Sequence, residues 1–376
     1  MEPRKIVLIL GNGFDLDLRL KTSYKDFWES GLCPKEYPAP IIHHLNQCWP
    51  KALDAVRWYD LENELINYYR ILQTGRVLSD IITSDERHFI ESVPPESLIY
   101  SIPGQFLQQA QALLEKGIMK ETYIPFRQYV IPFREDLLKS TVWRDKNALR
   151  LIKDKLCEYL KELKHNSSEK GTVAYQVLLS MLKSAEKEDF VDIYTFNYTK
   201  VHCYGHSIAD SMVHYMHGSC DSGRIIIGTR DDMEMNVDYD FLQKGMDPYF
   251  NPPGLVTALK EADEVIIFGH SLGENDRQYF APFFKKQANV DDSSKKSITI
   301  FTKNHDSQIE IKRALQKMTE GNLSTLFSRN QPIIIKTECL QEDQQLLFDF
   351  LVNHHFDIHH TEELIGKLIK SQQNPQ

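Results

Sequence analysis

Two side chains suited to chemistry follow short apolar runs in this sequence, Asn197 after Tyr194-Thr195-Phe196 and His217 before Gly218. An asparagine can hydrogen-bond sugar hydroxyls or hold a water without titrating. A histidine before a glycine at a strand end can transfer protons near neutral pH. Asn197 could instead cap the next turn, and His217 could be a hydrogen-bonded turn histidine. His214 is the weaker candidate, because it lies within its apolar run.

A third candidate is Ser271, in the sequence Gly269-His270-Ser271-Leu272-Gly273. This G-x-S-x-G pattern after an apolar run has the form of an α/β-hydrolase nucleophile elbow. Chain order permits a hydrolase, because Asp349 and several histidines lie downstream. The alternative is a glycine turn whose serine contacts a phosphate or a backbone group.

The turn Gly11-Asn12-Gly13-Phe14-Asp15 directly follows the apolar run 5–10. Glycines there let backbone N–H groups approach a phosphate, and a following helix start adds a favourable dipole. Asp15 could hydrogen-bond a ribose hydroxyl or cap a helix. The turn lacks the full G-x-G-x-x-G fingerprint, so a ligand-free strand-to-helix turn remains the alternative to a nucleotide site.

The elements that must position these residues are apolar runs that indicate buried strands of a parallel sheet. The runs are 5–10, 191–196, 212–216, 224–227, 264–268, 297–301 and 332–336. Helical patterns lie between several of them, which favours an α/β fold with a Rossmann-like, mostly parallel sheet.

The segment 21–186 has a different character and predicts a large helical insertion after the first strand. Apolar residues between 149 and 163 recur at helical spacing, and 172–187 continues the pattern. We therefore expect a nucleotide-binding core of residues 1–20 and 187–340, an insertion of 21–186, and C-terminal helices in 341–376.

Five motifs together resemble the AbiH family of bacterial phage abortive-infection proteins. They are GNGFDLDLRLKTSYKDF (11–27), WYDLENEL (58–65), YTFNYT (194–199), HGS (217–219) and FGHSLGENDRQYF (268–280). Their order also resembles the broader sirtuin-like fold, in which such motifs surround NAD. The resemblance implies an antiviral-defence protein that binds NAD and cleaves its nicotinamide–ribose bond. The scattered single cysteines and the short N-terminal apolar run separately predict a cytoplasmic location.

The same resemblance assigns roles to individual residues. It implies that Asn197 and His217 are catalytic, with Asn197 positioning the ribose or the attacking water and His217 accepting a proton. The implied NAD contacts are Gly11, Asn12, Gly13, Phe14, Asp15, Thr195, Gly269, Ser271 and Asp276. The alternatives are, from another class, a non-catalytic NAD or ADP-ribose sensor or interaction protein and, thirdly, an α/β-hydrolase that uses Ser271.

The sequence departs from the sirtuin-like pattern at four positions. Asn12 and Asp15 replace small residues of G-A-G-x-S, and Thr199 stands where N-Y-D has its acid. Asp276 lies two positions later than G-x-S-x-x-D would place it. The four-cysteine zinc module of the protein-deacylating sirtuins is missing, which argues against a deacylase.

Composition limits the remaining partners. The net charge of −9 argues against general nucleic-acid binding, and no stretch approaches the ~20 apolar residues that span a bilayer. We expect no metal, although His355 and His359 have the i, i+4 spacing of a helical chelate. A phage-derived trigger and a homo-oligomer are further expectations.

Two more charged residues are candidates for the site. Glu62 could point into the pocket from the insertion or be an exposed helix acid. Arg230 could meet a phosphate, or pair with Asp231 or Asp232 at the surface.

Overall fold

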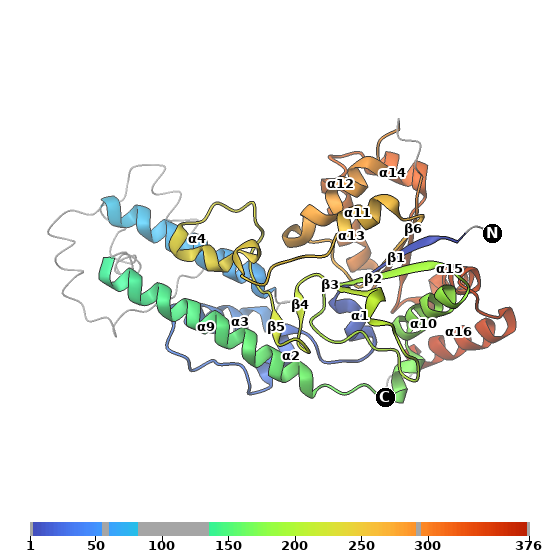
Figure 1. Ribbon diagram of the computed structural model, residues 1–376, viewed down its shortest axis with the longest axis horizontal. Helices are drawn as coiled ribbons and strands as arrows, with labels where there is room; N and C mark the ends of the chain where they lie inside the picture. Colours follow the sequence, from blue (N-terminus) through green and yellow to red (C-terminus); the bar gives the residue numbers. More distant parts are fainter. Residues whose placement is uncertain (1–2, 55–59, 82–134, 291–294, 374–376) are drawn as a thin grey trace. The chain divides into compact units, whose positions relative to one another are not determined.

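The computed structural model describes residues 3–54, 60–81, 135–290 and 295–373 (Figure 1). The chain divides into two compact units. The first comprises residues 1–23, 157–226 and 249–376, and the second comprises 24–156 and 227–248.

The first unit is built on a six-stranded sheet in which every neighbouring pair of strands runs parallel. Its strands are β1 (Lys5–Leu10), β2 (Phe190–Thr195), β3 (Val213–Tyr215), β6 (Glu264–Phe268), β7 (Ser297–Thr302) and β8 (Ile333–Lys336). Their order is β3-β2-β1-β6-β7-β8. Numbered within this sheet alone, that is 3-2-1-4-5-6, the strand order of dinucleotide-binding folds. The expected α/β fold with a Rossmann-like sheet is confirmed.

Strand β1 occupies the centre of the sheet because its side chains can be buried on both faces. Residues from Ile6 to Leu10 are all buried, and they alternate between two apolar clusters on opposite faces. Ile6 and Leu8 belong to one cluster, whereas Val7 and Ile9 belong to the other. A continuous apolar run is typical of such a strand.

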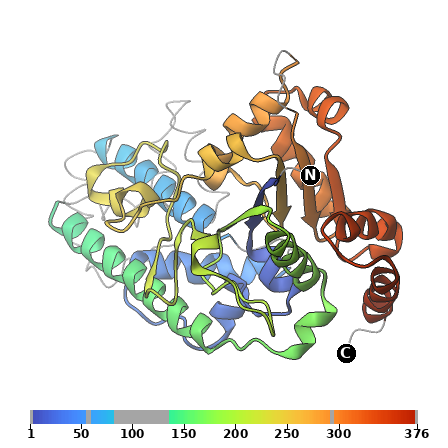
Figure 2. The same cartoon turned by 45° about the vertical axis from the view of Figure 1, so that its right-hand side comes forward.

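Helices cover both faces of the sheet (Figure 1, Figure 2). One face packs against α1 (Asn12–Asp17), α10 (Val173–Glu186), α15 (Leu340–Asn353) and α16 (Ile358–Gln373). The other packs against α11 (Leu255–Glu261), α12 (Arg277–Gln287), α13 (His305–Met318) and α14 (Leu323–Asn330). Helix α10 thus belongs to the sheet-bearing unit, whereas the sequence placed it in the insertion.

The segment expected as a strand at 224–227 is not part of this sheet. Its residues Arg224–Ile225 form β5, which pairs antiparallel with β4 (Gly218–Ser219) in a separate two-stranded ribbon. Gly218 has φ +75°, and a Cβ there would lie 2.0 Å from the Arg224 carbonyl oxygen. A hairpin this tight therefore requires glycine after His217.

The second unit is mainly helical. It contains α2 (Tyr24–Glu29), α3 (Pro40–Asp54), α4 (Leu61–Ile81), most of α9 (Glu135–Glu162) and the 3-10 helices η6 (Val237–Leu242) and η7 (Lys244–Met246). Buried Asp145 joins three of them, because it accepts hydrogen bonds from Ile41 N, Tyr68 Oη and Tyr239 Oη at 3.0, 2.5 and 3.1 Å. Burial raises the pKa of Asp145 to about 7.

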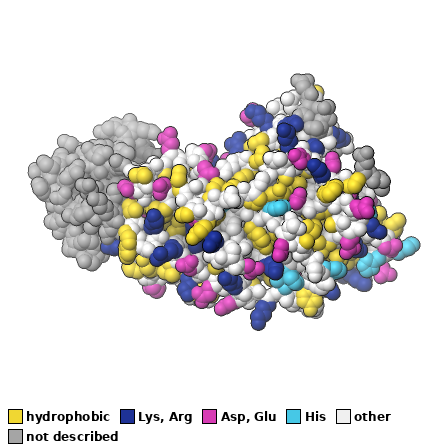
Figure 3. All heavy atoms as spheres, in the orientation of Figure 1, with side chains coloured by type: hydrophobic (Ala, Val, Ile, Leu, Met, Phe, Trp, Pro, Cys, Tyr) yellow, Lys and Arg dark blue, Asp and Glu magenta, His cyan; other side chains and the backbone are white. Residues whose placement is uncertain are grey.

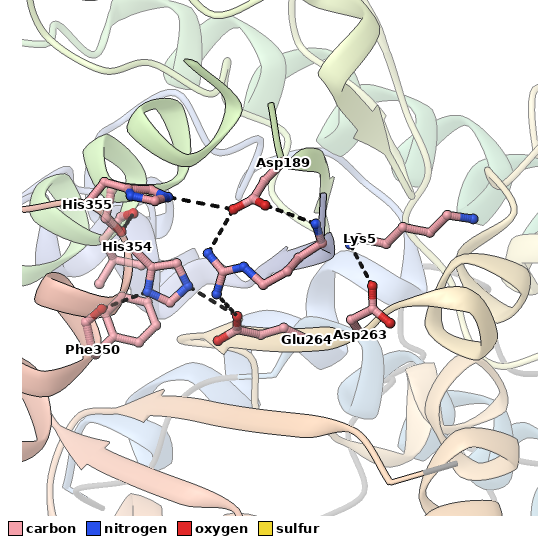
Figure 4. Close-up of polar contacts among 10 residues, drawn as sticks. Lys5, Asp189, Asp263, Glu264, Phe350, His354 and His355 are labelled. Atoms are coloured by element: carbon pink, nitrogen blue, oxygen red, sulfur yellow. Dashed lines mark hydrogen bonds and ion pairs between the residues drawn. The ribbon is translucent and has the colours of Figure 1, made fainter. Parts of the chain in front are cut away.

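The amino ends of the central strands of the sheet are tied together by a polar cluster (Figure 4). Arg4 lies 2.7 Å from Asp189 Oδ2 and 3.2 Å from Glu264 Oε2. His354, at the end of α15, hydrogen-bonds the Phe350 carbonyl and lies 3.3 Å from Glu264. This cluster lies at the edge of the sheet opposite the strand ends described next.

No helix within the described ranges has the length and apolarity required to cross a membrane. On the face drawn in Figure 3, the Lys and Arg side chains are interspersed with Asp and Glu side chains.

Candidate functional site

The four sequence motifs of the first unit follow the carboxyl ends of neighbouring strands. Gly11–Asp15 follows β1, Asn197 follows β2, His217 follows β3, and the loop 269–276 follows β6. Strand order reverses between β1 and β6. In α/β sheets, ligands bind outside the carboxyl ends of the strands at this switch point.

The glycines after β1 and β6 allow their two turns to pack backbone against backbone. Gly11 N donates to the Phe268 carbonyl and Gly13 N to the Gly269 carbonyl, both at 2.9 Å. A Cβ on Gly13 would lie 2.7 Å from Gly269 Cα, and one on Gly11 would lie 2.5 Å from His270 Cα. The amides of Gly11 and Gly13 are therefore already used within the protein, instead of facing a phosphate as the sequence predicted.

Three other residues expected to contact NAD make contacts within the protein. Asn12 Oδ1 accepts a hydrogen bond from Thr22 Oγ1 at 2.6 Å. Phe14 is buried edge-on against Phe268, with ring centroids 5.5 Å apart. Thr195 is fully buried, and its Oγ1 accepts a hydrogen bond from the backbone N–H of Asn197 at 3.1 Å.

Asp15 lies in a buried hydrogen-bonded group with Thr199 and Asn197. Thr199 Oγ1 donates to Asp15 Oδ2 at 2.5 Å, and the Asn197 side chain also hydrogen-bonds this carboxyl group. Asn197 Nδ2 in addition donates to the Gly11 carbonyl at 3.1 Å, which ties the end of β2 to the glycine turn. Burial raises the pKa of Asp15 to about 7, against the lowering effect of both hydrogen bonds. Asp15 is thus an acid that titrates near neutral pH.

Asp276 lies between two buried histidines. Its Oδ1 is 3.3 Å from His217 Nε2, and its Oδ2 is 3.4 Å from His270 Nε2. A carboxylate beside an imidazole orients the ring and stabilises its protonated form. The structure therefore pairs Asp276 with histidines, whereas the resemblance implied that it contacts NAD.

His270 fixes the loop that follows β6. Its Nδ1 accepts a hydrogen bond from the Leu272 amide at 3.0 Å, so the proton of the neutral ring is on Nε2, facing Asp276. Leu272 has φ +53°, a left-handed conformation that this hydrogen bond helps to hold. Phe196 packs against the rings of both His217 and His270, with centroids 5.3 and 4.3 Å away.

Ser271 differs from His217 and His270, because it is exposed and they are buried. Its side chain is exposed and lines a cleft of about 220 Å³ between the loop and α13. His270, the adjacent residue, directs its two ring nitrogens to Leu272 and Asp276. The G-x-S-x-G pattern therefore does not place that histidine on the serine.

The same loop contains a buried polar atom that a ligand could satisfy. Asn275 is 8% exposed, and its Oδ1 has no hydrogen-bond partner among the residues that the structure describes. A buried acceptor in this state is unfavourable unless a donor reaches it. A ribose hydroxyl or a carboxamide N–H group is a suitable donor.

The charged residues singled out elsewhere have partners in the second unit. Glu62 Oε2 lies 3.0 Å from Nζ of Lys244, a lysine whose side chain is 1% exposed. Arg230 Nε lies 2.8 Å from Asp232 Oδ1, the surface pairing that the sequence offered as an alternative to a phosphate.

The two tail histidines do not share one helix. His355 lies in the turn after α15 with φ +69°, and His359 lies in the first turn of α16. The i, i+4 geometry of a helical chelate is therefore not formed. Trp58 and Tyr59 of the WYDLENEL motif lie outside the described residues.

Residues 7–301 match the family described as Bacteriophage abortive infection AbiH. The chain belongs to the AbiH family. No curated protein and no solved structure matches it. The match covers the sheet from most of β1 to most of β7 together with the whole second unit, so it includes the five motifs that resemble the family.

Sequence reasoning missed the contributions of His270 and Asn275. Both lie inside the FGHSLGENDRQYF motif, in which the resemblance implied roles only for Gly269, Ser271 and Asp276. The available signal for His270 was a histidine beside a glycine at the end of an apolar run, as at His217.

Proposed function

We propose that this AbiH-family chain binds NAD at the carboxyl edge of its parallel sheet and cleaves the nicotinamide–ribose bond during abortive infection. The observation that carries the proposal is the His217–Asp276 pair, next to the strand-order reversal of a dinucleotide-type sheet. The family description supplies the biological setting of phage defence.

The proposed reaction consumes one water and one NAD. The C1′–nitrogen bond of the ribose breaks through an oxocarbenium-like state, and nicotinamide departs with the bonding electrons as a neutral molecule. Water oxygen bonds to C1′, which gives ADP-ribose, and the released proton passes to His217. With Nε2–H directed to Asp276, the lone pair of His217 is on Nδ1, and Asp276 stabilises the imidazolium that forms.

Asn197 and Asn275 would supply the uncharged contacts. Asn197 is held by the Gly11 carbonyl and by Asp15, so its position at the end of β2 is fixed before a ligand arrives. Asn275 Oδ1 would accept a hydrogen bond from the ribose or the carboxamide. Because the amides of Gly11 and Gly13 are used internally, the pyrophosphate would depend on other donors of the pocket.

The decisive experiment measures nicotinamide release from NAD by purified wild type and by His217→Gln. His214→Gln is the matched control, because His214 lies three residues earlier, on β3, and pairs with Asp192 at 2.9 Å. Loss of a general base typically reduces the rate by ~10²–10⁴-fold. Equal rates for wild type and His217→Gln would refute the catalytic assignment.

Binding must be measured beside turnover, because effectors of abortive infection can be held inactive until infection. Calorimetry with NAD and with ADP-ribose reports binding, and NAD levels in phage-infected cells that express the chain report activation. Binding without turnover in both settings would favour the non-catalytic sensor. Ester cleavage abolished only by Ser271→Ala would favour the hydrolase, which the hydrogen bonds of His270 do not support.

A further inference from the structure

A second cluster of chemically competent side chains lies in the first unit, outside the pocket proposed above. His165 and Glu169 flank the start of the 3-10 helix η4 (Ser167–Gly171), and His202 lies in the loop after β2. One possible ligand atom from each of the three lies within 4.8 Å of the other two. The imidazole rings of His165 and His202 are stacked with centroids 4.3 Å apart.

The position of Glu169 is fixed by its backbone surroundings. Asn166 and Glu169 form a capping box, in which Glu169 Oε1 accepts from Asn166 N at 2.8 Å. The same oxygen accepts from His165 Nδ1 at 3.0 Å. Since Nδ1 of His165 carries the proton in that hydrogen bond, the lone pair of the neutral ring is on Nε2.

Two buried atoms of the cluster have no hydrogen-bond partner within the described part of the chain. They are Glu169 Oε2, whose side chain is completely buried, and His202 Nδ1. A buried carboxylate oxygen with no donor is costly, and so is a buried imidazole nitrogen. A single cation placed among the three side chains would satisfy both.

We propose that His165, Glu169 and His202 bind a divalent transition-metal ion, with Zn²⁺ the best match. Two imidazole nitrogens and one carboxylate oxygen form a known three-residue zinc set that leaves a fourth position for water. Tetrahedral ligands on bonds of about 2.1 Å lie roughly 3.4 Å apart, so small side-chain rotations close the cluster around an ion. This assignment replaces the sequence-based expectation of no metal.

The ion would join two segments that the sequence separates. It links η4, which precedes α10, to the loop after β2, in which Thr199 holds Asp15. The Asn166 amide acts as an outer support by fixing the ligating carboxylate, as partners of metal ligands commonly do. The ion would therefore stabilise the loop beside the candidate pocket, and the proposal stands whether or not the chain cleaves NAD.

The test uses full-length, tag-free protein that has been stripped with EDTA and dialysed against ZnCl₂. Elemental analysis is expected to find one zinc per wild-type chain, and Glu169→Gln and His202→Asn are expected to weaken binding at least tenfold. Glu169→Gln keeps an oxygen for the Asn166 amide, so it preserves the capping box. His206→Asn, in the same loop but exposed, is the matched control, and His355→Ala with His359→Ala removes the exposed tail histidines.

Co²⁺ provides an independent readout, because tetrahedral Co²⁺ bound to these ligands absorbs visible light. The wild type and both controls are expected to show this absorption, and His165→Ala, which alters a partly exposed residue, is expected to lose it while circular dichroism stays unchanged. Zinc that is absent from the wild type, retained by Glu169→Gln and His202→Asn, or lost only with the tail histidines would overturn the assignment.

Discussion

Thr199 Oγ1 donates a hydrogen bond of 2.5 Å to Asp15 Oδ2, which joins the turn after β1 to the segment after β2. Both residues are positions at which the sequence departs from the sirtuin-like pattern. That pattern has a serine in the first turn and an acid after the asparagine, whereas this chain has an acid in the first turn and a hydroxyl after Asn197. The two departures therefore compensate each other across one contact.

If the acid and the hydroxyl are interchangeable across this contact, exchanging them should be tolerated better than either single change. Asp15→Ser removes the acceptor, and Thr199→Asp places a second carboxylate beside Asp15. We expect each to reduce the free energy of unfolding by about 1–3 kcal/mol, and the double variant to regain about 1–2 kcal/mol of the sum. Urea denaturation measures this coupling, and strictly additive losses would contradict it.

The buried carboxyl of Asp15 should make stability fall as pH rises. Its folded-state pKa of about 7 exceeds the ordinary value of 3.8, so folding favours the protonated form between these two values. The stabilisation is complete below pH 3.8 and is lost as pH rises through 7. Asp15→Asn cannot titrate, so its stability relative to wild type should increase between pH 4 and 8, by on the order of 4 kcal/mol at most.

Unfolding curves at several pH values measure this difference. Asp221→Asn, which removes a charge from an exposed position, is the control for the loss of one acid. A stability difference between Asp15→Asn and wild type that does not change with pH would show that Asp15 is ionised throughout.

The sequence predicted the sheet well because its strands are buried on both faces. The runs at 5–10 and 264–268 coincide with β1 and β6, and the ends of the other runs in this sheet differ from the observed strands by at most one residue. The run at 224–227 was assigned wrongly, because periodicity does not distinguish a strand of the main sheet from a short ribbon. The left-handed Gly218 directs the chain into that ribbon.

The candidate site was only partly predictable, since the sequence shows residue types but not their partners. The pattern of apolar runs predicted that Asn197, His217 and Asp276 follow strand ends at one edge of the sheet, and the structure has them there. It did not show that Gly13 and Gly269 pack against each other, because that contact joins positions 256 residues apart in the chain. The proximity of His165, Glu169 and His202 could not be predicted for the same reason, because His202 lies far in sequence from Glu169.

Gly269 should be among the least replaceable residues of the first unit. It has φ +64°, and a Cβ there would lie 2.3 Å from Phe14 N and 2.4 Å from the Gly13 carbonyl carbon. Gly269→Ala must therefore separate the turns after β1 and β6, and we expect a loss of more than about 3 kcal/mol. Gly273→Ala is the control in the same loop, because its Cβ would meet only Ser271 Oγ at 3.2 Å. Similar melting temperatures for the two variants would contradict this explanation.

The polar cluster at the amino edge of the sheet should stabilise the protein because Glu264 is buried there. Glu264 lies 3.2 Å from Arg4, and Glu261 lies at the same 3.2 Å from Lys5, but the Glu264 side chain is 10% exposed and that of Glu261 is 57% exposed. Glu264→Gln removes the negative charge that pairs with Arg4 at a site where water cannot replace it. We therefore expect the free energy of unfolding to fall by about 1–2 kcal/mol. Glu261→Gln should cost less than about 0.5 kcal/mol, because water solvates both partners. Chemical denaturation measures the stability lost by each variant. Because the two ion pairs have the same length, a larger loss for Glu264→Gln reflects burial, and equal losses would contradict this explanation.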